Sequence, residues 1–354
     1  MIHTAAKRAN RVLELEPSFA SKPYASIEAT QRVIFVPTVA DVRNWNHGAL
    51  LTVTGDSLLL LWASGARDEA AAGACVLASW SHDEGITWSE PEIAVPPFEP
   101  TDLSHTLLAT NTAPETVLTL PDGRSFVAYD ITSVTPDDIY TPIGVAAHEL
   151  GADWPEPKWI HAGDDSLEMA DAATARVLRN ALIARGRVGR SALALSWRGK
   201  WPHSANEQVF IETVSLPLLN GAGWVRYGRG YGTEADDKLL YQFSANGADY
   251  QPIGAAVMDH APSLVAGLIH SSGKRLLAWN QEGVRNPLLI GVSDDALNWN
   301  AIYVLRDDAS EPEFPGYAKW GGPSYPSLCE ISDGRVACAY SIAKERIEIS
   351  IFSL

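Results

Sequence analysis

The sequence contains little sulfur, with three cysteines and three methionines in 354 residues. The cysteines, Cys75, Cys329 and Cys338, are odd in number and lie in apolar, strand-like runs, which predicts buried free thiols and no disulfide framework. Metal-binding and nucleotide-binding motifs are missing too: there is no H-E-x-x-H, no paired C-x-x-C, no P-loop and no glycine-rich dinucleotide fingerprint. We therefore expect neither a metal site nor a cofactor.

Positive charge is scarce, because 27 Lys and Arg face 43 Asp and Glu, for a formal net charge of −16. This balance argues against a nucleic acid partner and against an anionic membrane. No apolar run reaches the length of a membrane-spanning helix, and residues 1–13 lack the apolar centre of a signal peptide. The sequence therefore predicts a soluble, cytoplasmic protein, or a secreted or periplasmic one if a signal peptide was removed.

Tryptophan, in contrast, is abundant, with 12 residues in a chain that is 46% hydrophobic. Many tryptophans favour a β protein with aromatic wedges or a surface that faces sugars. The first regular stretch predicts four short strands separated by tight turns, at residues 49–54, 57–64, 74–80 and 92–95. Four such strands in under 50 residues are typical of one blade of a β-propeller.

The octet Ser81–Trp88 has the pattern S-x-D-x-G-x-T-W and predicts a hairpin turn. The Asp83 carboxylate can accept hydrogen bonds from nearby backbone N–H groups, Gly85 can take a positive φ, and Trp88 can pack beneath the turn. We interpret Asp83 as a turn residue and not as a catalyst. Shorter versions that also end in an aromatic residue follow at 148–154, 244–250 and 293–299. Repetition at a period of about 50–70 residues indicates a propeller.

We predict an all-β fold, a β-propeller with six blades, or seven if residues 165–255 contain an extra one. A single domain is expected over residues 31–354, with residues 1–30 packed on it or leading into it. An N-terminal strand near 33–36 is expected to join the last blade and close the ring. Residues 172–183 can be read as a helix.

Two candidate catalytic residues, His47 and Tyr325, each come just before the first strand of a predicted blade. First strands line the centre of a propeller and begin at the face where ligands bind, so we expect both side chains at the mouth of one central pocket. A tyrosine near a lysine such as Lys319 can transfer a proton, since a neighbouring cation lowers the pKa of a phenol. His47 as a packing residue is the structural alternative.

Further candidates are predicted to bind substrate. Arg285 ends a polar loop between two strands, where a bidentate guanidinium suits a carboxylate ligand, although a surface ion pair would explain it equally well. Lys319 lies in a Gly- and Pro-rich loop that is expected to place it beside Tyr325. Asn280 belongs to the same polar stretch as Arg285 and is a further candidate for substrate binding. The remaining candidates lie in predicted loops and are more readily explained as solvated, rim or structural residues: Arg67, His203, Tyr231 and His260.

The octet Ser81–Trp88 resembles the Asp-box, or BNR repeat, of sialidase-like β-propellers. In that superfamily the box is structural and lies on the face opposite the active site. Residues 46–88, together with Asp259–Ser263, Arg285–Leu288, Tyr325–Pro326 and Lys344–Glu345, resemble one group of such propellers. The enzymes of that group cleave α-L-rhamnosyl-(1→4)-D-glucuronate ends, as rhamnosidases or lyases, and are distantly similar to ulvan lyases.

That resemblance implies an acidic oligosaccharide as substrate and a catalytic role for His47. A lyase must neutralise the uronate carboxylate, abstract the adjacent acidified proton and protonate the leaving oxygen. Arg285 and Lys319 would neutralise the carboxylate. His47 and Tyr325 would be the base and the acid, in an order that stays open.

Two alternatives remain. Tyr325-Pro-Ser-Leu, followed by Asp333-Gly-Arg335, resembles the segment that carries the tyrosine nucleophile of exo-α-sialidases. The sialidase F-R-I-P motif, however, lacks its arginine here, where the sequence is Phe35-Val36-Pro37. The second alternative is a non-catalytic, lectin-like propeller, because the fold does not determine the function.

Overall fold

The structure is a computed structural model, and it describes residues 16–38, 43–67, 73–97, 109–120, 122–134, 140–151, 156–162, 168–185, 209–231, 237–247, 249–251, 254–281, 283, 285–316 and 319–354. A short strand predicted at residues 12–15 lies outside this part of the chain. So do residues 186–208, which include a predicted strand at 191–197.

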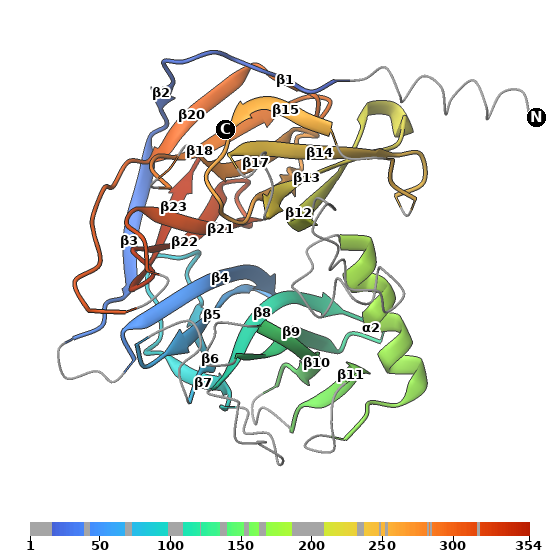
Figure 1. Ribbon diagram of the computed structural model, residues 1–354, viewed down its shortest axis with the longest axis vertical. Helices are drawn as coiled ribbons and strands as arrows, with labels where there is room; N and C mark the ends of the chain where they lie inside the picture. The colour runs from blue at the N-terminus through green and yellow to red at the C-terminus, as the bar shows by residue number, and fades with distance from the viewer. Residues whose placement is uncertain are drawn as a thin grey trace, which may run out of the picture.

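Consecutive antiparallel sheets form the blades of a β-propeller, as predicted (Figure 1). The first blade consists of β4 (Trp45–Thr54), β5 (Ser57–Gly65), β6 (Cys75–Ser81) and β7 (Glu92–Val95). The second consists of β8 (Ala109–Thr119), β9 (Ser125–Val134), β10 (Tyr140–Glu149) and β11 (Lys158–Ala162). The third consists of β12 (Val209–Pro217), β13 (Trp224–Tyr231), β14 (Lys238–Ser244) and β15 (Gly254–Asp259).

The remaining two blades recruit strands from the N-terminal region. The fourth contains β16 (Ala266–Ile269), β17 (Arg275–Asn280), β18 (Leu288–Ser293) and β20 (Ala301–Arg306), with β2 (Ala25–Ser26) parallel to β20. The last contains β21 (Pro323–Glu330), β22 (Val336–Ile342) and β23 (Arg346–Phe352). Its fourth strand is β3 (Ala29–Phe35), antiparallel to β23, and β3 corresponds to the strand predicted near residues 33–36.

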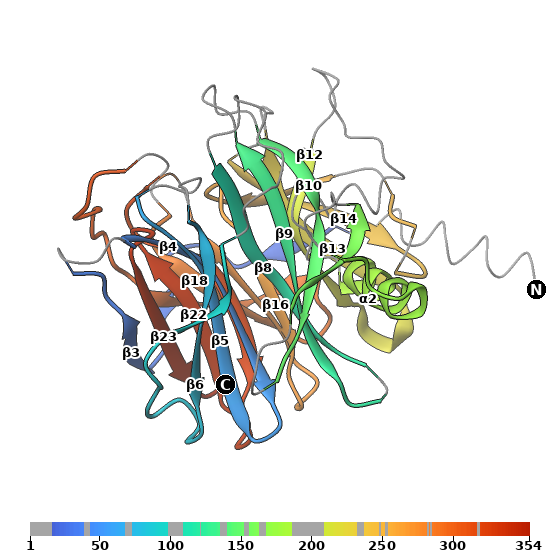
Figure 2. The same ribbon diagram turned by 90° about the horizontal axis from the view of Figure 1, so that it is seen from below.

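The predicted count of six blades is not confirmed, because the described residues form five. Between β11 and β12 the chain forms α2 (Ala172–Arg185), where a helix was predicted over 172–183. The helix lies beside the second blade, against β11 and β8 (Figure 2). Two short pieces complete the assignment: the parallel pair of β1 (Ser18–Phe19) with β19 (Asn298–Trp299), and the turn η1 (Leu219–Gly221). None of the helices in the described ranges is long and apolar enough to cross a membrane.

Apolar side chains pack between neighbouring blades. One cluster joins Leu60 and Trp62 of the first blade to Ala339 and Ile349 of the last. Further clusters lie between the first and second blades, between the third and fourth, and between the fourth and last. Several strands are buried on both faces, which explains their long apolar runs. The three cysteines are buried and free, as predicted.

The octet Ser81–Trp88 forms the predicted turn between β6 and β7. Asp83 accepts hydrogen bonds from the Thr87 N–H (2.8 Å), the Thr87 hydroxyl (2.5 Å) and the Ser81 hydroxyl (2.9 Å). These bonds, led by those from Thr87, lower the pKa of Asp83 to about 2. Gly85 has φ of +85°, and the indole N–H of Trp88 donates to the Gly85 carbonyl. The turn thus supplies its own hydrogen-bond partners.

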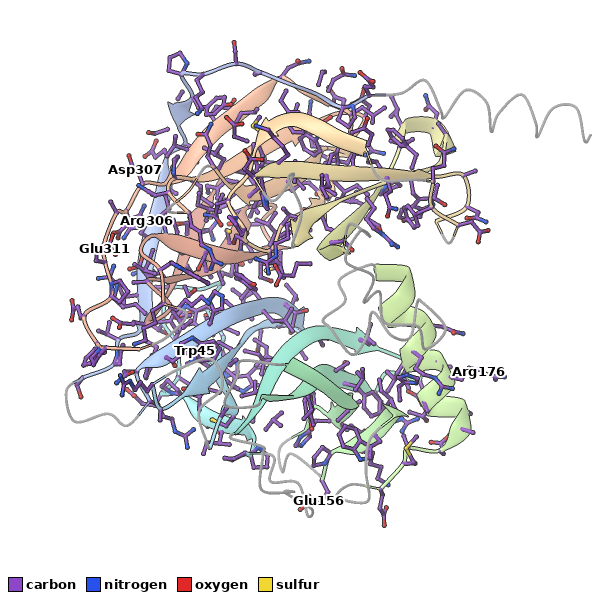
Figure 3. All side chains as sticks on the ribbon, in the orientation of Figure 1. Trp45, Glu156, Arg176, Arg306, Asp307 and Glu311 are labelled. Carbon is purple, nitrogen blue, oxygen red and sulfur yellow. The ribbon has the colours of Figure 1, made fainter. Side chains whose placement is uncertain are left out.

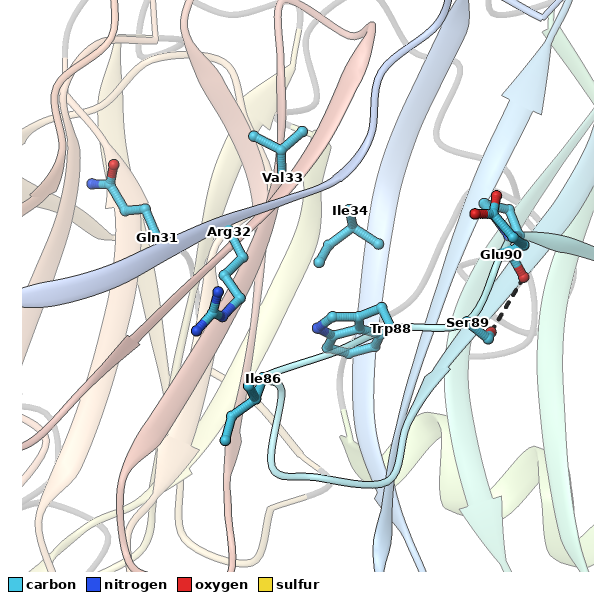
Figure 4. Close-up of a pocket in the computed structure, with 9 residues that line it drawn as sticks. Gln31, Arg32, Val33, Ile34, Ile86, Trp88, Ser89 and Glu90 are labelled. Atoms are coloured by element: carbon cyan, nitrogen blue, oxygen red, sulfur yellow. Dashed lines mark hydrogen bonds between the residues drawn. The ribbon is translucent and has the colours of Figure 1, made fainter.

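A shallow groove with a volume of about 400 Å³ lies beside this turn, between β3 and residues 86–91 (Figure 4). Trp88 lies between Ile34 and Ile86, and Arg32 projects from β3 toward the same space. The groove adjoins the Asp-box end of the first blade. None of its lining residues belongs to the candidate functional site described below.

Candidate active site

Irregularities in three first strands carry the candidate residues. First strands of neighbouring blades lie against one another, β21 against β4 and β12 against β16, so they line the centre of the propeller. The register shifts between His47 and Leu50 in β4, between Ile211 and Val214 in β12, and between Ser324 and Ser327 in β21. Such bulges redirect side chains and are frequent beside active sites.

These bulges also correct the predicted strand boundaries. His47 was expected just before a first strand but lies inside β4, whereas Tyr325, expected at the start of a first strand, lies near the start of β21. The prediction failed because a strand with a bulge does not alternate regularly. His47 pairs with Ala63, whereas the Asp-box is at the other end of β5, where Leu58 pairs with Ser81. The box and His47 are therefore at opposite ends of the blade, as predicted.

A tyrosine and a glutamate from different blades form the chemical centre of the cluster. The Tyr325 hydroxyl donates to Oε1 of Glu212 over 2.5 Å. The other oxygen of Glu212 forms an ion pair with Arg229, at 2.8 Å from Nε. Tyr325 and Glu212 have φ of 56° and 53°, a conformation that costs a residue with a side chain about 1–3 kcal/mol. A phenol that donates a hydrogen bond to a carboxylate can transfer its proton to that carboxylate, which would make the phenol oxygen a nucleophile.

His47 packs directly against Tyr325, with ring centroids 4.0 Å apart. Its Nδ1 lies 2.7 Å from the Ser341 hydroxyl, and its side chain is 4% exposed. Burial, followed by the charges of Lys344, Arg285 and Arg229, keeps the pKa of His47 well below its ordinary value. The imidazole is therefore neutral at physiological pH.

Arg285 joins the same cluster from the loop between β17 and β18, as predicted. Its guanidinium carbon lies 5.4 Å from the ring centroid of Tyr325 and 4.6 Å from that of Trp320. It donates a hydrogen bond to the Pro262 carbonyl over 2.6 Å, has φ of 60° and is 4% exposed. Buried positive charge beside the phenol can attract an anionic ligand.

His260 is fully buried next to the same cations. Burial, then Arg229 and Arg285, lowers the pKa of His260 to about 3. The His260 side chain is 0% exposed, so its position supports the structural explanation rather than the predicted binding role.

Lys319 does not have the surroundings expected of a substrate-binding residue. Its ammonium forms an ion pair with Glu345 at 2.7 Å and donates to the Asn44 carbonyl over 2.9 Å. Its side chain is 1% exposed. The carboxylate of Glu345 therefore takes the interaction that was predicted for a substrate carboxylate.

Asn280 and Arg67 lie at the ends of strands. The Asn280 amide donates to the carbonyls of Arg285 and Pro323, over 2.8 Å and 2.7 Å, and so ties the Arg285 loop to the start of β21. This arrangement supports a positioning role for Asn280. Arg67 is exposed just after β5. His203 lies outside the described residues, and of Tyr231 only the backbone at the end of β13 is described.

Four residues of the cluster were absent from the predicted site: Glu212, Arg229, Trp320 and Lys344. Glu212 had a signal in the sequence, since it is a lone carboxylate in the apolar run Val209–Leu216. A charge there is costly unless it is paired, and Arg229 supplies the pair. Trp45, which is labelled in Figure 3, is fully buried at the start of β4. Its ring centroid lies 5.8 Å from that of His47, which it supports. Within the described ranges, no three His, Cys, Asp or Glu residues gather as metal ligands would.

Several solved structures share this fold at low sequence identity. A sialidase matches with a TM-score of 0.73 and 16% identity, over 96% of this chain and 34% of that one. The intramolecular trans-sialidase of Ruminococcus gnavus matches with a TM-score of 0.59 and 10% identity, over 91% and 97% of the two chains. The leech intramolecular trans-sialidase matches with a TM-score of 0.59 and 11% identity, over 92% and 70%.

These likenesses show a sialidase-like β-propeller fold, as the Asp-box predicted, and leave the activity open. The chain spans about a third of the length of the first of these sialidases. No protein-family model and no curated protein sequence matches this chain. The resemblance to rhamnosyl-glucuronate enzymes receives no support from these comparisons.

Proposed function

We propose that this protein is an exo-glycosidase that cleaves the bond between a terminal, carboxylate-bearing sugar and its neighbour, with Tyr325 as nucleophile. The observation that carries the proposal is the hydrogen bond of 2.5 Å from the Tyr325 hydroxyl to Glu212, beside buried arginines. Glycosidases generally use two carboxylates, and sialidases are the exception that uses a tyrosine. The solved sialidases of the same fold support this choice over other chemistries.

The charges in the cluster explain why a tyrosine suits an acidic sugar. If the anomeric carbon carries a carboxylate, an anionic nucleophile is repelled as it approaches. A neutral phenol that passes its proton to Glu212 only during attack avoids that repulsion. Arg285 and Arg229 would hold the sugar carboxylate, so that the same cations orient the substrate and offset its charge.

The proposed reaction takes two displacements. Glu212 accepts the phenol proton while the Tyr325 oxygen bonds to the anomeric carbon and the bond to the leaving oxygen breaks. The leaving oxygen takes a proton from solvent or an acid. Water then attacks the anomeric carbon, loses a proton to a base, and releases Tyr325, which regains its proton. Two inversions give a product with retained configuration.

A uronate lyase or rhamnosidase acting on rhamnosyl-glucuronate ends is the second candidate. The specific observation in its favour is that His47 and Tyr325, the predicted base and acid, lie in ring contact beside Arg285. Against it, the pKa of His47 is well below its ordinary value, which makes the imidazole a weak base.

Parallel assays separate the candidates. An aryl glycoside of a sialic acid is expected to release its phenol, with activity lost in Tyr325→Phe and Glu212→Gln but largely kept in His47→Asn. A rhamnosyl-glucuronate disaccharide that yields ultraviolet absorbance from a new conjugated C=C bond, with activity lost in His47→Asn, would overturn the proposal in favour of the lyase. Free rhamnose without that absorbance would indicate the rhamnosidase. Binding of these sugars without turnover would indicate a lectin-like protein.

A further inference from the structure

An exposed indole covers two buried cations at the edge of this site. Trp320 is 51% exposed, whereas Arg285 is 4% and Lys344 1% exposed. The centroid of its ring lies 4.6 Å from the guanidinium carbon of Arg285 and 4.4 Å from the ammonium of Lys344. Two buried cations that share one ring repel each other, and the negative face of the indole offsets part of that repulsion.

The turn between β22 and β23 fixes the backbone at Lys344. Ala343 and Lys344 both have positive φ, of 54° and 55°. The Lys344 carbonyl accepts a hydrogen bond from the Asn46 N–H over 2.7 Å, and the Ala343 N–H donates to Gly322 over 2.9 Å. The turn is thereby tied both to the first blade, beside His47, and to the loop that carries Trp320.

The neighbouring carboxylate is engaged elsewhere. Glu345 pairs with Lys319 at 2.7 Å and accepts hydrogen bonds from the N–H groups of Glu313 and Phe314, each over 2.9 Å. Two adjacent residues thus serve different purposes: Glu345 completes a buried structural ion pair, while the charge of Lys344 acts on the cluster. Of the neighbouring charges, Lys344 has the largest effect on the pKa of His47.

We propose that Lys344, Arg285 and Trp320 form the anion-recognising wall of the site, in which Lys344 joins Arg285 and Arg229 in binding the carboxylate of the sugar. The inference rests on the proposed function for the identity of the anion as a sugar carboxylate. Trp320 holds the two cations in place before the ligand arrives and limits their hydration. The role that the sequence predicted for Lys319 thereby belongs to Lys344.

The wall makes the carboxylate a condition for binding. A hydrogen bond from a buried cation to a carboxylate contributes more than a neutral one, so loss of Lys344 should weaken an acidic ligand by roughly 10- to 100-fold. A neutral analogue of the same sugar has no carboxylate to pair with Lys344, so it should bind equally to the proteins with and without Lys344. The ratio of the two dissociation constants therefore isolates the contribution of Lys344.

The test is direct binding, in the background of Tyr325→Phe so that turnover does not interfere. The probes are 2-deoxy-2,3-didehydro-N-acetylneuraminic acid, its analogue with the carboxylate reduced to an alcohol, and glucuronate, followed by calorimetry and tryptophan fluorescence. The variants are Lys344→Met, Lys344→Arg and, as a matched control, Lys274→Met. Lys274 forms a surface ion pair with Asp294.

Lys344→Met is expected to weaken binding of the acid by roughly 10- to 100-fold, to leave the alcohol unchanged, and to be partly rescued in Lys344→Arg. Trp320→Phe should abolish the fluorescence change on binding while keeping part of the affinity. Equal losses for acid and alcohol, no loss in Lys344→Met, or no binding of either acid would overturn the proposal. Melting curves of each variant show whether it is folded.

The outcome is independent of catalysis. An acid-selective loss in Lys344→Met, together with full turnover in Tyr325→Phe, would keep the anion-recognising wall and overturn Tyr325 as nucleophile. Unselective binding together with loss of turnover in Tyr325→Phe would overturn the wall and keep the nucleophile.

Discussion

The two ends of the propeller strands are built by different means. At the Asp-box end, the side chains and backbone of residues 81–88 satisfy one another, and positive φ falls on Glu84 as well as on Gly85. At the opposite end, the positive φ values fall on Glu212, Tyr325 and Arg285, and buried charges stand beside neutral histidines. The first end gains stability from local hydrogen bonds, whereas the second buries charged side chains, which cost stability unless they are paired.

This contrast predicts that substitutions at the two ends separate activity from stability. Functional residues held under strain are typically poor for stability, so their loss should reduce activity without unfolding the protein. Substitutions in the turn should lower stability without reducing activity. The predictions below test this separation, from the largest expected effect to the smallest.

The largest effect is expected for Tyr325→Phe. Removal of the hydroxyl that donates a hydrogen bond to Glu212 should lower kcat/KM by at least about 10³-fold, because both the nucleophile and its proton transfer to Glu212 are lost. The melting temperature should stay the same or rise. Steady-state kinetics and thermal unfolding measure both quantities, with Tyr250→Phe, in a box turn at the other end, as the control. Activity that survives in Tyr325→Phe would contradict the assignment.

Lys319→Met is expected to destabilise the protein strongly and to affect recognition little. Loss of one partner leaves Glu345 buried without its ion pair, at a cost of about 3–5 kcal/mol in the free energy of unfolding. The double variant with Glu345→Gln should recover part of it. Urea unfolding gives the stability, and the KM for an acidic substrate shows whether Lys319 takes part in binding. A large rise in KM in a stably folded variant would restore its predicted role.

Acid should destabilise the protein through its buried histidines. The pKa of His260 falls from 6.5 to about 3 on folding. Below pH 6.5 the unfolded state therefore binds a proton at this histidine that the native state does not bind. His260 therefore does not lower the free energy of unfolding above pH 6.5, and lowers it progressively as the pH falls toward 3. Urea midpoints between neutral pH and about pH 4 should decline less steeply in His260→Leu than in the unchanged protein. Parallel curves would contradict a depressed pKa.

Asp83→Ala tests the Asp-box end and should give the smallest effect. Its hydrogen bonds to Thr87 and Ser81 are lost, which should lower the melting temperature by a few degrees. Catalysis should be unchanged, because the box is at the far end of β5 from His47. Asp294→Ala removes an exposed carboxylate from another box turn and serves as the control. A drop in kcat for Asp83→Ala would break the separation between the two ends.

The architecture could be predicted from sequence because its determinants are local. The octet at 81–88 specifies its own turn, and its repeats, together with alternating apolar residues, indicate a propeller. The blade count was less accessible, since the region between β11 and β12 carries no box. Loops bounded by clear strands were also predictable, as for Arg285 between β17 and β18.

The site could be predicted only in part because its geometry depends on non-local contacts. His47, Tyr325 and Arg285 were proposed and do come together. Glu212 was hidden in a strand whose bulge the sequence does not reveal, and its partner Arg229 lies on the neighbouring strand. Lys319 was predicted to bind substrate but pairs with Glu345, because which lysine reaches Glu345 depends on how the loop before β21 folds against the last turn.

The central claim is that Tyr325 attacks the anomeric carbon, and covalent trapping tests it most directly. A fluorinated sugar-acid fluoride slows the second displacement and should leave the glycosyl group on the enzyme. Peptide mass spectrometry is expected to find that group on Tyr325, and on no residue in Tyr325→Phe. A label on His47 or elsewhere, or turnover of the matching aryl glycoside with no trapped adduct, would contradict the account.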